Sequence, residues 1–359
     1  MRKYILTAML ASIITSLAVA QNVKFVDATD LAIYGYTKKT DKSPYYRFDH
    51  TPYKFHPAIV EHALKPSGLY VAIKTNSTKL FASWDVVPMN VRDNMPFMML
   101  HGLDLYTKVD GEWSYVMAPR IPCDLQEASY TKRLIKGLPH EEREYLLYLP
   151  IWCELKSLRI GVDKDATIEA LDKPFRHKVV VFGSSITHGA AASRPGLTYT
   201  AQMSRNLGID FVNFGFAGQC KMQPEFLRFL QSCEADAFLF DTFSNPTALE
   251  VKERLESFVE GLVKAHPGKP LIFMQTAISH HGCLEPKKYE QRKTRLETVR
   301  RMMNELVKRY KDVYFLEVEN VAGKDGTIDT THPNDLGFNR FVEAYQPKIA
   351  KILKKYGIK

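Results

Sequence analysis

A serine, a histidine and an aspartate occupy positions in this sequence where together they could hydrolyse an ester. The serine, Ser185, follows the apolar run 180–182 within the segment Gly183-Ser-Ser-Ile-Thr-His-Gly189, which leads toward a predicted helix. There it would lie near a helix N-terminus, where free N–H groups and the helix dipole favour a developing negative charge. Taken alone, the segment fits equally well a serine that only caps a helix.

The aspartate and the histidine, Asp329 and His332, lie three residues apart on one predicted loop. At this spacing the carboxylate can bond the imidazole, fix its tautomer and stabilise the imidazolium that forms when the ring takes the serine proton. An Asp-x-x-His pair is more often an ordinary hydrogen-bonded loop pair. The position of this pair, after a predicted strand and directly before the C-terminal helix, favours a catalytic role.

Two further segments could stabilise the oxyanion of such a reaction. Gly218 follows the predicted strand 210–214, and a glycine there allows a backbone N–H to approach a substrate oxygen. Asn245 follows the run 237–241 and precedes Pro246, and its side-chain N–H could reach the same oxygen. The plainer interpretations are a turn glycine and an Asn-Pro turn.

These four segments follow predicted strands of one parallel sheet. From His177 onward, apolar runs without alternation are separated by amphipathic stretches, which is typical of βαβ units. The predicted strands are 178–182, 210–214, 237–241, 270–275 and 313–316, and the predicted helices are 248–265, 289–309 and 336–354. We expect Asn334 or Asp335 to cap the last helix. Active sites of open parallel sheets form at the carboxyl ends of the strands, so the segments should meet there.

The first half of the chain has a different pattern. Aromatic and β-branched residues alternate with polar ones in the short runs 68–74, 79–84, 103–106, 145–149 and 157–161. This pattern predicts an all-β sandwich or jelly roll. We place this accessory domain at 21–175 and the catalytic domain at 176–359, joined by a linker at 164–176. Several aromatic residues could stack on sugars, although we expect most of them to pack in the core or the domain interface. They are Tyr36, Tyr46, Trp84, Tyr106 and Trp113.

Residues 1–20 have the pattern of a secretory signal peptide. A positive start is followed by an apolar stretch, Ile5–Leu17, and by the small-x-small sequence Ala18-Val-Ala20. The apolar stretch is shorter than the ~20 residues that a membrane span needs, and no cysteine follows it. We therefore expect cleavage after Ala20, a periplasmic or secreted protein, and no membrane anchor.

Composition argues against other classes of protein. Of the 359 residues, 45% are hydrophobic and 25% are charged, as in ordinary globular chains, and the net charge of +9 comes from scattered lysines. Because no basic run is interleaved with aromatics, we expect no nucleic-acid partner. The cysteines, whose pairing stays open, are Cys123, Cys153, Cys220, Cys233 and Cys283. They lack metal-ligand spacing, so we expect no metal. We interpret His280-His281 as part of a solvated loop.

In order and spacing, the chemical segments of the second half resemble the conserved blocks of SGNH/GDSL hydrolases. The resemblance rests on Gly183–Thr187, Gly218, Asn245 and Asp329-x-x-His332 and covers about 180 residues. It implies a flavodoxin-like α/β domain that needs no cofactor. It also implies a nucleophile, Ser185, a general base and acid, His332, and an orienting carboxylate, Asp329. The implied oxyanion hole consists of the N–H groups of Ser185 and Gly218 and the side chain of Asn245.

Two departures from the family pattern accompany this resemblance. Ser184 stands where an aspartate usually precedes the nucleophile, and Phe243-Ser-Asn-Pro246 replaces the usual Gly-x-Asn-Asp. Neither change removes a residue of the triad.

The first half is similar to the Gly-x-Asp-Leu-Tyr accessory domain that precedes one SGNH subgroup in exported bacterial proteins. The similarity rests on His101-Gly-Leu-Asp-Leu-Tyr-Thr107 and Gly111-Glu-Trp113, and the stretch Ala192–Gly196 also resembles that subgroup. The resemblance implies a carbohydrate esterase that removes acetyl or similar small acyl groups from a small-molecule or oligosaccharide ester. Arg47 or Asp104 could help the accessory domain to shape the cleft.

Two other functions stay open at this point. One is a lipid or lysophospholipid esterase, or an acyltransferase that uses the same serine. The other is a glycan-binding protein whose first domain carries the function. The sequence leaves open the sugar, the acyl group, the substrate-binding residues and the oligomeric state.

Overall fold

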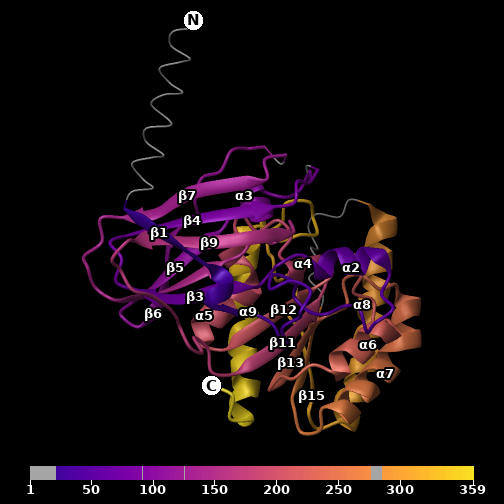
Figure 1. Cartoon of the computed structure of the whole chain (residues 1–359). Coiled ribbons are helices and arrows are strands. Elements are labelled where there is room, and N and C mark those ends of the chain that lie inside the picture. The colour runs from indigo at the N-terminus through magenta and orange to yellow at the C-terminus, as the bar shows by residue number, and fades with distance from the viewer. Residues whose placement is uncertain (1–21, 91, 125, 276–284) are drawn as a thin grey trace, which may run out of the picture.

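The computed structural model describes residues 22–90, 92–124, 126–275 and 285–359 (Figure 1). The predicted signal peptide, His280-His281 and Cys283 therefore lie outside the described residues. The described chain forms a β-sandwich followed by an α/β domain with a parallel sheet, so the predicted fold class is confirmed. No helix in these ranges is long and apolar enough to cross a membrane.

The sandwich consists of two antiparallel sheets. In spatial order, the smaller sheet contains β1 (Val23–Asp27), β9 (Leu155–Asp163), β4 (Lys79–Val86) and β7 (Ser129–Lys136). The larger sheet contains β10 (Ile168–Ala170), β3 (Tyr70–Thr75), β8 (Arg143–Tyr148), β5 (Asp104–Val109) and β6 (Glu112–Met117), and β2 (Ala32–Tyr34) also pairs with β3. The core follows from period-two alternation: in β4, Leu80, Ala82 and Trp84 are fully buried between the sheets.

Three features of the first half differ from the sequence prediction. The predicted linker contains β10, which pairs with β3. Two short helices, α2 (Pro57–Ala63) and α3 (Phe97–His101), were not predicted, because one or two turns give no detectable helical period. The stretch between β2 and β3 leaves the sandwich, and Phe48 and Phe55 pack in the core of the α/β domain.

The parallel sheet has the strand order β12-β11-β13-β14-β15, which is the flavodoxin order. The strands are β11 (Lys178–Gly183), β12 (Asp210–Gly215), β13 (Ala237–Asp241), β14 (Leu271–Met274) and β15 (Val313–Leu316). One face is covered by α5 (Tyr199–Leu207) and α9 (Asp335–Lys355), and the other by α6 (Pro224–Gln231), α7 (Ala248–Ala265) and α8 (Pro286–Arg309) (Figure 1). Burial on both faces explains the non-alternating apolar strands. Asn334 caps α9 by accepting the N–H of Gly337, which confirms one of the two predicted caps.

The accessory-domain motif contributes a buried ion pair to the domain interface. Asp104, which is fully buried, accepts hydrogen bonds from Arg194 Nη1 at 2.6 Å and from the N–H of Gly196 at 2.9 Å. The same Arg194 nitrogen donates to the hydroxyl of Tyr106 at 2.7 Å. A Cβ on Gly196 would collide with the Tyr106 ring, so this position requires glycine. Burial raises the pKa of Asp104 to about 6, against the opposing effect of Arg194.

Burial shows how the aromatic residues and cysteines singled out in the sequence are placed. Of the five aromatics considered above, Tyr36, Trp84 and Tyr106 are buried, which confirms the packing interpretation for most of them. The four cysteines in the described ranges carry free thiols, and only Cys123 among these is exposed.

Candidate active site

Ser185 begins the short helix α4 (Ser185–His188), directly after β11. The preceding Ser184 caps this helix, because its hydroxyl accepts the N–H of Ile186 at 3.2 Å. A Cβ on Gly183 would collide with the side chain of Thr187, so only glycine permits this turn. In the sheet, β11 lies between β12 and β13. The loops that carry Gly218 and Asn245 therefore leave the sheet on either side of Ser185.

The structure joins Ser185, His332 and Asp329 by direct hydrogen bonds. Nε2 of His332 lies 2.9 Å from Oγ of Ser185, and Nδ1 lies 2.7 Å from Oδ2 of Asp329. With the proton of the neutral ring on Nδ1, the imidazole donates to the carboxylate and can accept the serine proton at Nε2. This is the geometry of a nucleophile, a base and an orienting carboxylate.

The loop that carries Asp329 is organised around the carboxylate. Oδ1 accepts the backbone N–H groups of Thr331 at 3.1 Å and His332 at 2.8 Å. Thr330, which directly follows Asp329, has a positive φ of 63°, a conformation that is unfavourable for a β-branched residue and that the surrounding contacts must maintain. Partial burial acts to raise the pKa of Asp329, but the hydrogen bonds from His332 and Asn94 outweigh it and lower the pKa to about 2. The carboxylate thus stays ionised near neutral pH.

Asn94, on the accessory domain, also contacts the Asp329 carboxylate. Its Nδ2 donates to Oδ2 of Asp329 at 2.9 Å and lies 3.4 Å from Nδ1 of His332. The sequence analysis did not find Asn94, because an asparagine on a loop more than 200 positions from Asp329 and His332 carries no sequence signal of its own.

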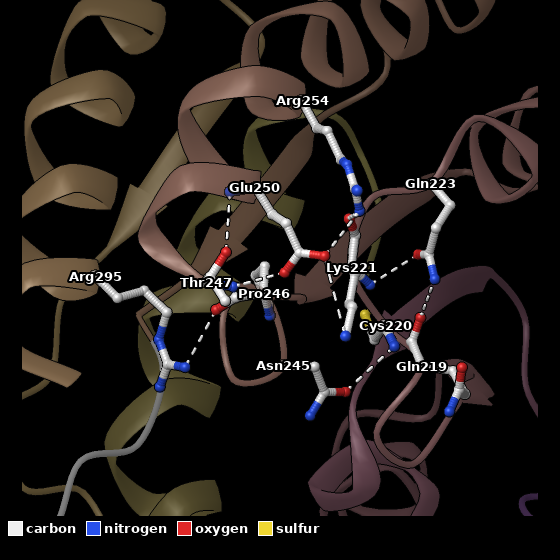
Figure 2. Close-up of polar contacts among 10 residues, drawn as sticks. All are labelled: Gln219, Cys220, Lys221, Gln223, Asn245, Pro246, Thr247, Glu250, Arg254 and Arg295. Carbon is white, nitrogen blue, oxygen red and sulfur yellow. Dashed lines mark hydrogen bonds and ion pairs between the residues drawn. The ribbon is translucent and has the colours of Figure 1, made fainter. Parts of the chain in front are cut away.

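Gly218 and Asn245 lie on loops that a hydrogen bond joins. Gly218 has a φ of 70°, in the left-handed region, and a Cβ there would meet no atom within 4 Å, so this face of the loop is open. The N–H of Cys220 donates to Oδ1 of Asn245 at 3.2 Å (Figure 2). Because a backbone N–H can only donate, this bond places the amide oxygen toward Cys220 and leaves Nδ2 as a donor for another group.

Polar contacts tie the Asn245 loop to its surroundings (Figure 2). Thr247 and Glu250 form a capping box at the start of α7. Glu250 also pairs with Arg254 at 3.3 Å, and Arg254 Nη1 donates to the carbonyl of Lys221 at 3.1 Å. The start of α7 and the loop after Gly218 are therefore held to each other.

Helix α8 contacts both the Asn245 loop and the loop that carries His332. Arg295 Nη1 donates to the carbonyl of Pro246 at 3.2 Å, next to Asn245, and Arg292 Nη2 donates to Oγ1 of Thr331 at 3.1 Å, next to His332. The two arginines are three positions apart and so share a face of the helix. Their long-range role could not be inferred from a helix that is rich in charged residues.

Arg47 fixes the end of β12 that leads to Gly218. Its fully buried guanidinium donates to the carbonyls of Asn213 at 3.1 Å and Gly215 at 2.9 Å, and to that of His62 at 2.5 Å. Burial lowers the pKa of Arg47 to about 9. The sequence analysis expected Arg47 or Asp104 to help the accessory domain shape the cleft. Arg47 contacts the strand before the Gly218 loop, and Asp104 contacts the loop that follows α4.

Comparisons with known proteins identify the family of the chain. Residues 176–350 match the GDSL-like lipase/acylhydrolase family, and residues 23–168 match the N-terminal domain of SGNH-hydrolase-type esterases. A solved protein from Bacteroides ovatus ATCC 8483, described as a GDSL-like lipase, is 38% identical, with a TM-score of 0.88 over 93% of this chain and 98% of that one. This chain belongs to the SGNH/GDSL esterase family.

More distant solved structures share the fold. A salicylyl-acyltransferase from a tetracycline biosynthetic pathway is 22% identical, with a TM-score of 0.73 over 94% of this chain and 99% of that one. A family two carbohydrate esterase from Cellvibrio japonicus is 13% identical, with a TM-score of 0.61 over 92% of this chain and 98% of that one. No curated protein matches the chain.

The first departure from the SGNH/GDSL pattern has a structural counterpart. Ser184 replaces the usual aspartate, and its hydroxyl donates to Oδ2 of Asp241 at 3.4 Å, while Thr187 donates to the same oxygen at 3.0 Å. Asp241 ends β13 and pairs in register with Gly183 of β11. A carboxylate from the neighbouring strand thus holds the turn that carries Ser185.

Asp241 should make stability depend on pH. Burial raises its pKa to about 7, against the hydrogen bonds from Thr187 and Ser184, whereas an aspartate in an unfolded chain has a pKa of about 3.9. Between these values the folded state binds a proton that the unfolded state releases, so the free energy of unfolding should decrease as the pH rises through this interval. Asp241→Asn should weaken this decrease, as measured by urea unfolding at about pH 5 and about pH 8. An identical pH dependence in the variant would contradict the assignment.

Removal of the Asn245 amide should slow catalysis more than it weakens binding. If Nδ2 stabilises an oxyanion, Asn245→Ala should lower kcat about 10²- to 10³-fold with little change in KM, because the donor acts on charge that develops in the transition state. Steady-state kinetics with an aryl acetate measures both constants. Asn206→Ala, which removes an exposed amide from the end of α5, is a matched control. A large rise in KM with unchanged kcat would instead indicate a role in substrate binding.

Within the described residues, no group of three or more His, Cys, Asp or Glu side chains could hold a metal ion.

Proposed function

We propose that this chain is an exported serine esterase that removes small acyl groups, principally acetyl, from a carbohydrate ester. The observation that carries the proposal is the continuous hydrogen-bonded series from Ser185 through His332 to Asp329, with contacts of 2.9 Å and 2.7 Å. Export is proposed from the signal-peptide pattern of residues 1–20.

In the proposed reaction, Ser185 Oγ attacks the ester carbonyl carbon while His332 Nε2 takes the hydroxyl proton. The carbonyl oxygen becomes an oxyanion, which the N–H groups of Ser185 and Gly218 and the Asn245 amide stabilise. Collapse of this intermediate breaks the C–O bond, and His332 gives its proton to the departing sugar hydroxyl. A water molecule, deprotonated by His332, then attacks the acyl-enzyme and releases acetate and the Ser185 hydroxyl.

The hollow beside Asn245 is lined by both charged and apolar side chains. A hollow of about 640 Å³ begins at Asn245, and its described walls include Lys287, Glu290 and Arg295 beside the exposed Leu249. The lining thus combines charged groups with apolar surface, and a sugar ester, which carries hydroxyl groups and nonpolar faces, fits such a lining. The similarity in fold to carbohydrate esterases agrees with this choice.

Hydrolysis of 4-nitrophenyl acetate and octanoate by the mature protein tests the acyl preference, and acetate release from acetylated xylan and pectin fragments tests the sugar. We expect turnover of the acetate, weak turnover of the octanoate, and acetate release from at least one glycan. Preference for the octanoate would favour a lipid esterase. Transfer of the acyl group to an added alcohol in preference to water would favour an acyltransferase, the activity named for one protein of similar fold.

A further inference from the structure

The accessory domain reaches the catalytic histidine loop through Asn94. This residue lies on the connection between β4 and α3, where the flanking Met89, Met95 and Phe97 pack against the core of the α/β domain. Arg92 on the same connection lies 4.0 Å from Glu61 of α2. Apolar anchors on both sides thus hold the asparagine against a loop of the other domain.

The donors to Asp329 show what Asn94 adds. A carboxylate has about four lone-pair positions, and Asp329 accepts from the N–H groups of Thr331 and His332, from the His332 ring and from Asn94. The first three donors belong to its own loop. Among the residues that the structure describes, Asn94 is the donor from outside that loop, and it shares Oδ2 with the imidazole. The Asp329 side chain is 33% exposed, so without Asn94 this oxygen would turn toward water.

We propose that Asn94 is a positioning residue for the catalytic triad, by which the accessory domain orients the Asp329 carboxylate and, through it, the His332 ring. The amide holds the plane of the carboxylate, so that Oδ2 stays in line with the Nδ1–H bond. It does so without touching the substrate or taking part in proton transfer. The accessory domain is therefore part of the catalytic apparatus, in addition to any role in binding glycan.

The test measures how fast an uncharged fluorophosphonate labels Ser185 in the mature full-length protein. This inference rests on the proposed role of Ser185 as nucleophile, but labelling needs no acetyl ester. Rapid labelling without any ester turnover would therefore count against the proposed substrate and leave the role of Asn94 testable. Mass spectrometry of the labelled peptide identifies the serine, and thermal unfolding followed by circular dichroism compares the stability of the variants.

We expect Asn94→Ala to slow labelling about tenfold or more, because the hydrogen bond that orients the Asp329 carboxylate is lost. Asn94→Asp keeps the shape of the side chain but places a second carboxylate against that of Asp329. It should slow labelling and also move the acidic limb of the pH–rate profile to higher pH, because a second negative charge favours the protonated imidazole. The matched control is Asn90→Ala, which removes an exposed amide from the same connection and should label at the wild-type rate.

Three results would overturn the proposal. One is wild-type labelling rates and an unchanged pH–rate profile in both Asn94 variants. Another is equal slowing in Asn90→Ala, which would assign the effect to the connection as a whole. The third is no labelling of Ser185 in the wild-type protein. If Asn94→Ala lowers the unfolding temperature, the pH–rate profile of the isosteric Asn94→Asp decides, because a purely structural loss would not move its acidic limb.

Discussion

Ser185→Ala should lower kcat/KM for an aryl acetate by about 10⁴-fold or more while the protein remains folded, because loss of the nucleophile in serine hydrolases has costs of this order. The side chain contacts His332, and its removal leaves the Asp329 contacts of the histidine in place. Steady-state kinetics on both proteins, with circular dichroism to compare their folds, makes the measurement.

The neighbouring serine provides a matched control for this substitution. Ser184 caps α4 and contacts Asp241, but its hydroxyl is not the one that bonds to His332. Ser184→Ala should therefore cost about 1 kcal/mol of stability, as loss of a helix cap does, and should retain most of the activity. Loss of activity in Ser184→Ala with activity kept in Ser185→Ala would place the nucleophile at the other serine.

Arg194→Met should reduce the free energy of unfolding by about 3–5 kcal/mol, because it leaves a buried carboxylate without its partner. Asp104 is fully buried, and the Arg194 guanidinium both bonds to it and lies 3.8 Å from the centre of the Tyr115 ring. Urea unfolding near neutral pH measures the loss. The loss should be smaller at about pH 5 than at about pH 8, because burial favours the neutral form of an unpaired carboxyl group.

A double variant shows how much of the lost stability comes from the unpaired charge and how much from lost packing. The double variant Asp104→Asn with Arg194→Met removes both charges of this pair, so a large part of the lost stability should return. Arg309→Met, which breaks an exposed pair with Glu256, should leave the midpoint of unfolding close to that of the wild type. Equal losses in the Arg194 and Arg309 variants would contradict a special role for the interface pair.

The Asp104–Arg194 and Asn94–Asp329 contacts connect the accessory domain to different loops of the α/β domain. Asp104 and Arg194 hold the loop that follows α4, whereas Asn94 reaches the loop that carries His332. Separate effects are therefore expected: Arg194→Met should act mainly on stability, and Asn94→Asp mainly on the pH dependence of Ser185 reactivity.

Much of the fold followed from local patterns in the sequence. The strands Ala237–Asp241 and Val313–Leu316 and the helix Ala248–Ala265 have the predicted bounds, because buried parallel strands are uniformly apolar and long helices have a strong period. Ser185, Asp329 and His332 were also predicted, because each follows a strand of the parallel sheet and two of them share one loop. In the structure, hydrogen bonds join His332 to Ser185 and to Asp329.

The tertiary structure alone decided which distant residues hold these groups in place. Asn94 reaches Asp329, and Arg47 reaches Asn213, each across more than 100 positions of sequence. Asp241 contacts Ser184, which stands where the family usually has an aspartate. The path of residues 35–67 over the α/β domain was likewise not predicted, since short helices and loops have no period. Periodicity identifies the elements and the chain order of the motifs, whereas contacts between domains depend on how the finished surfaces fit together, which no local pattern encodes.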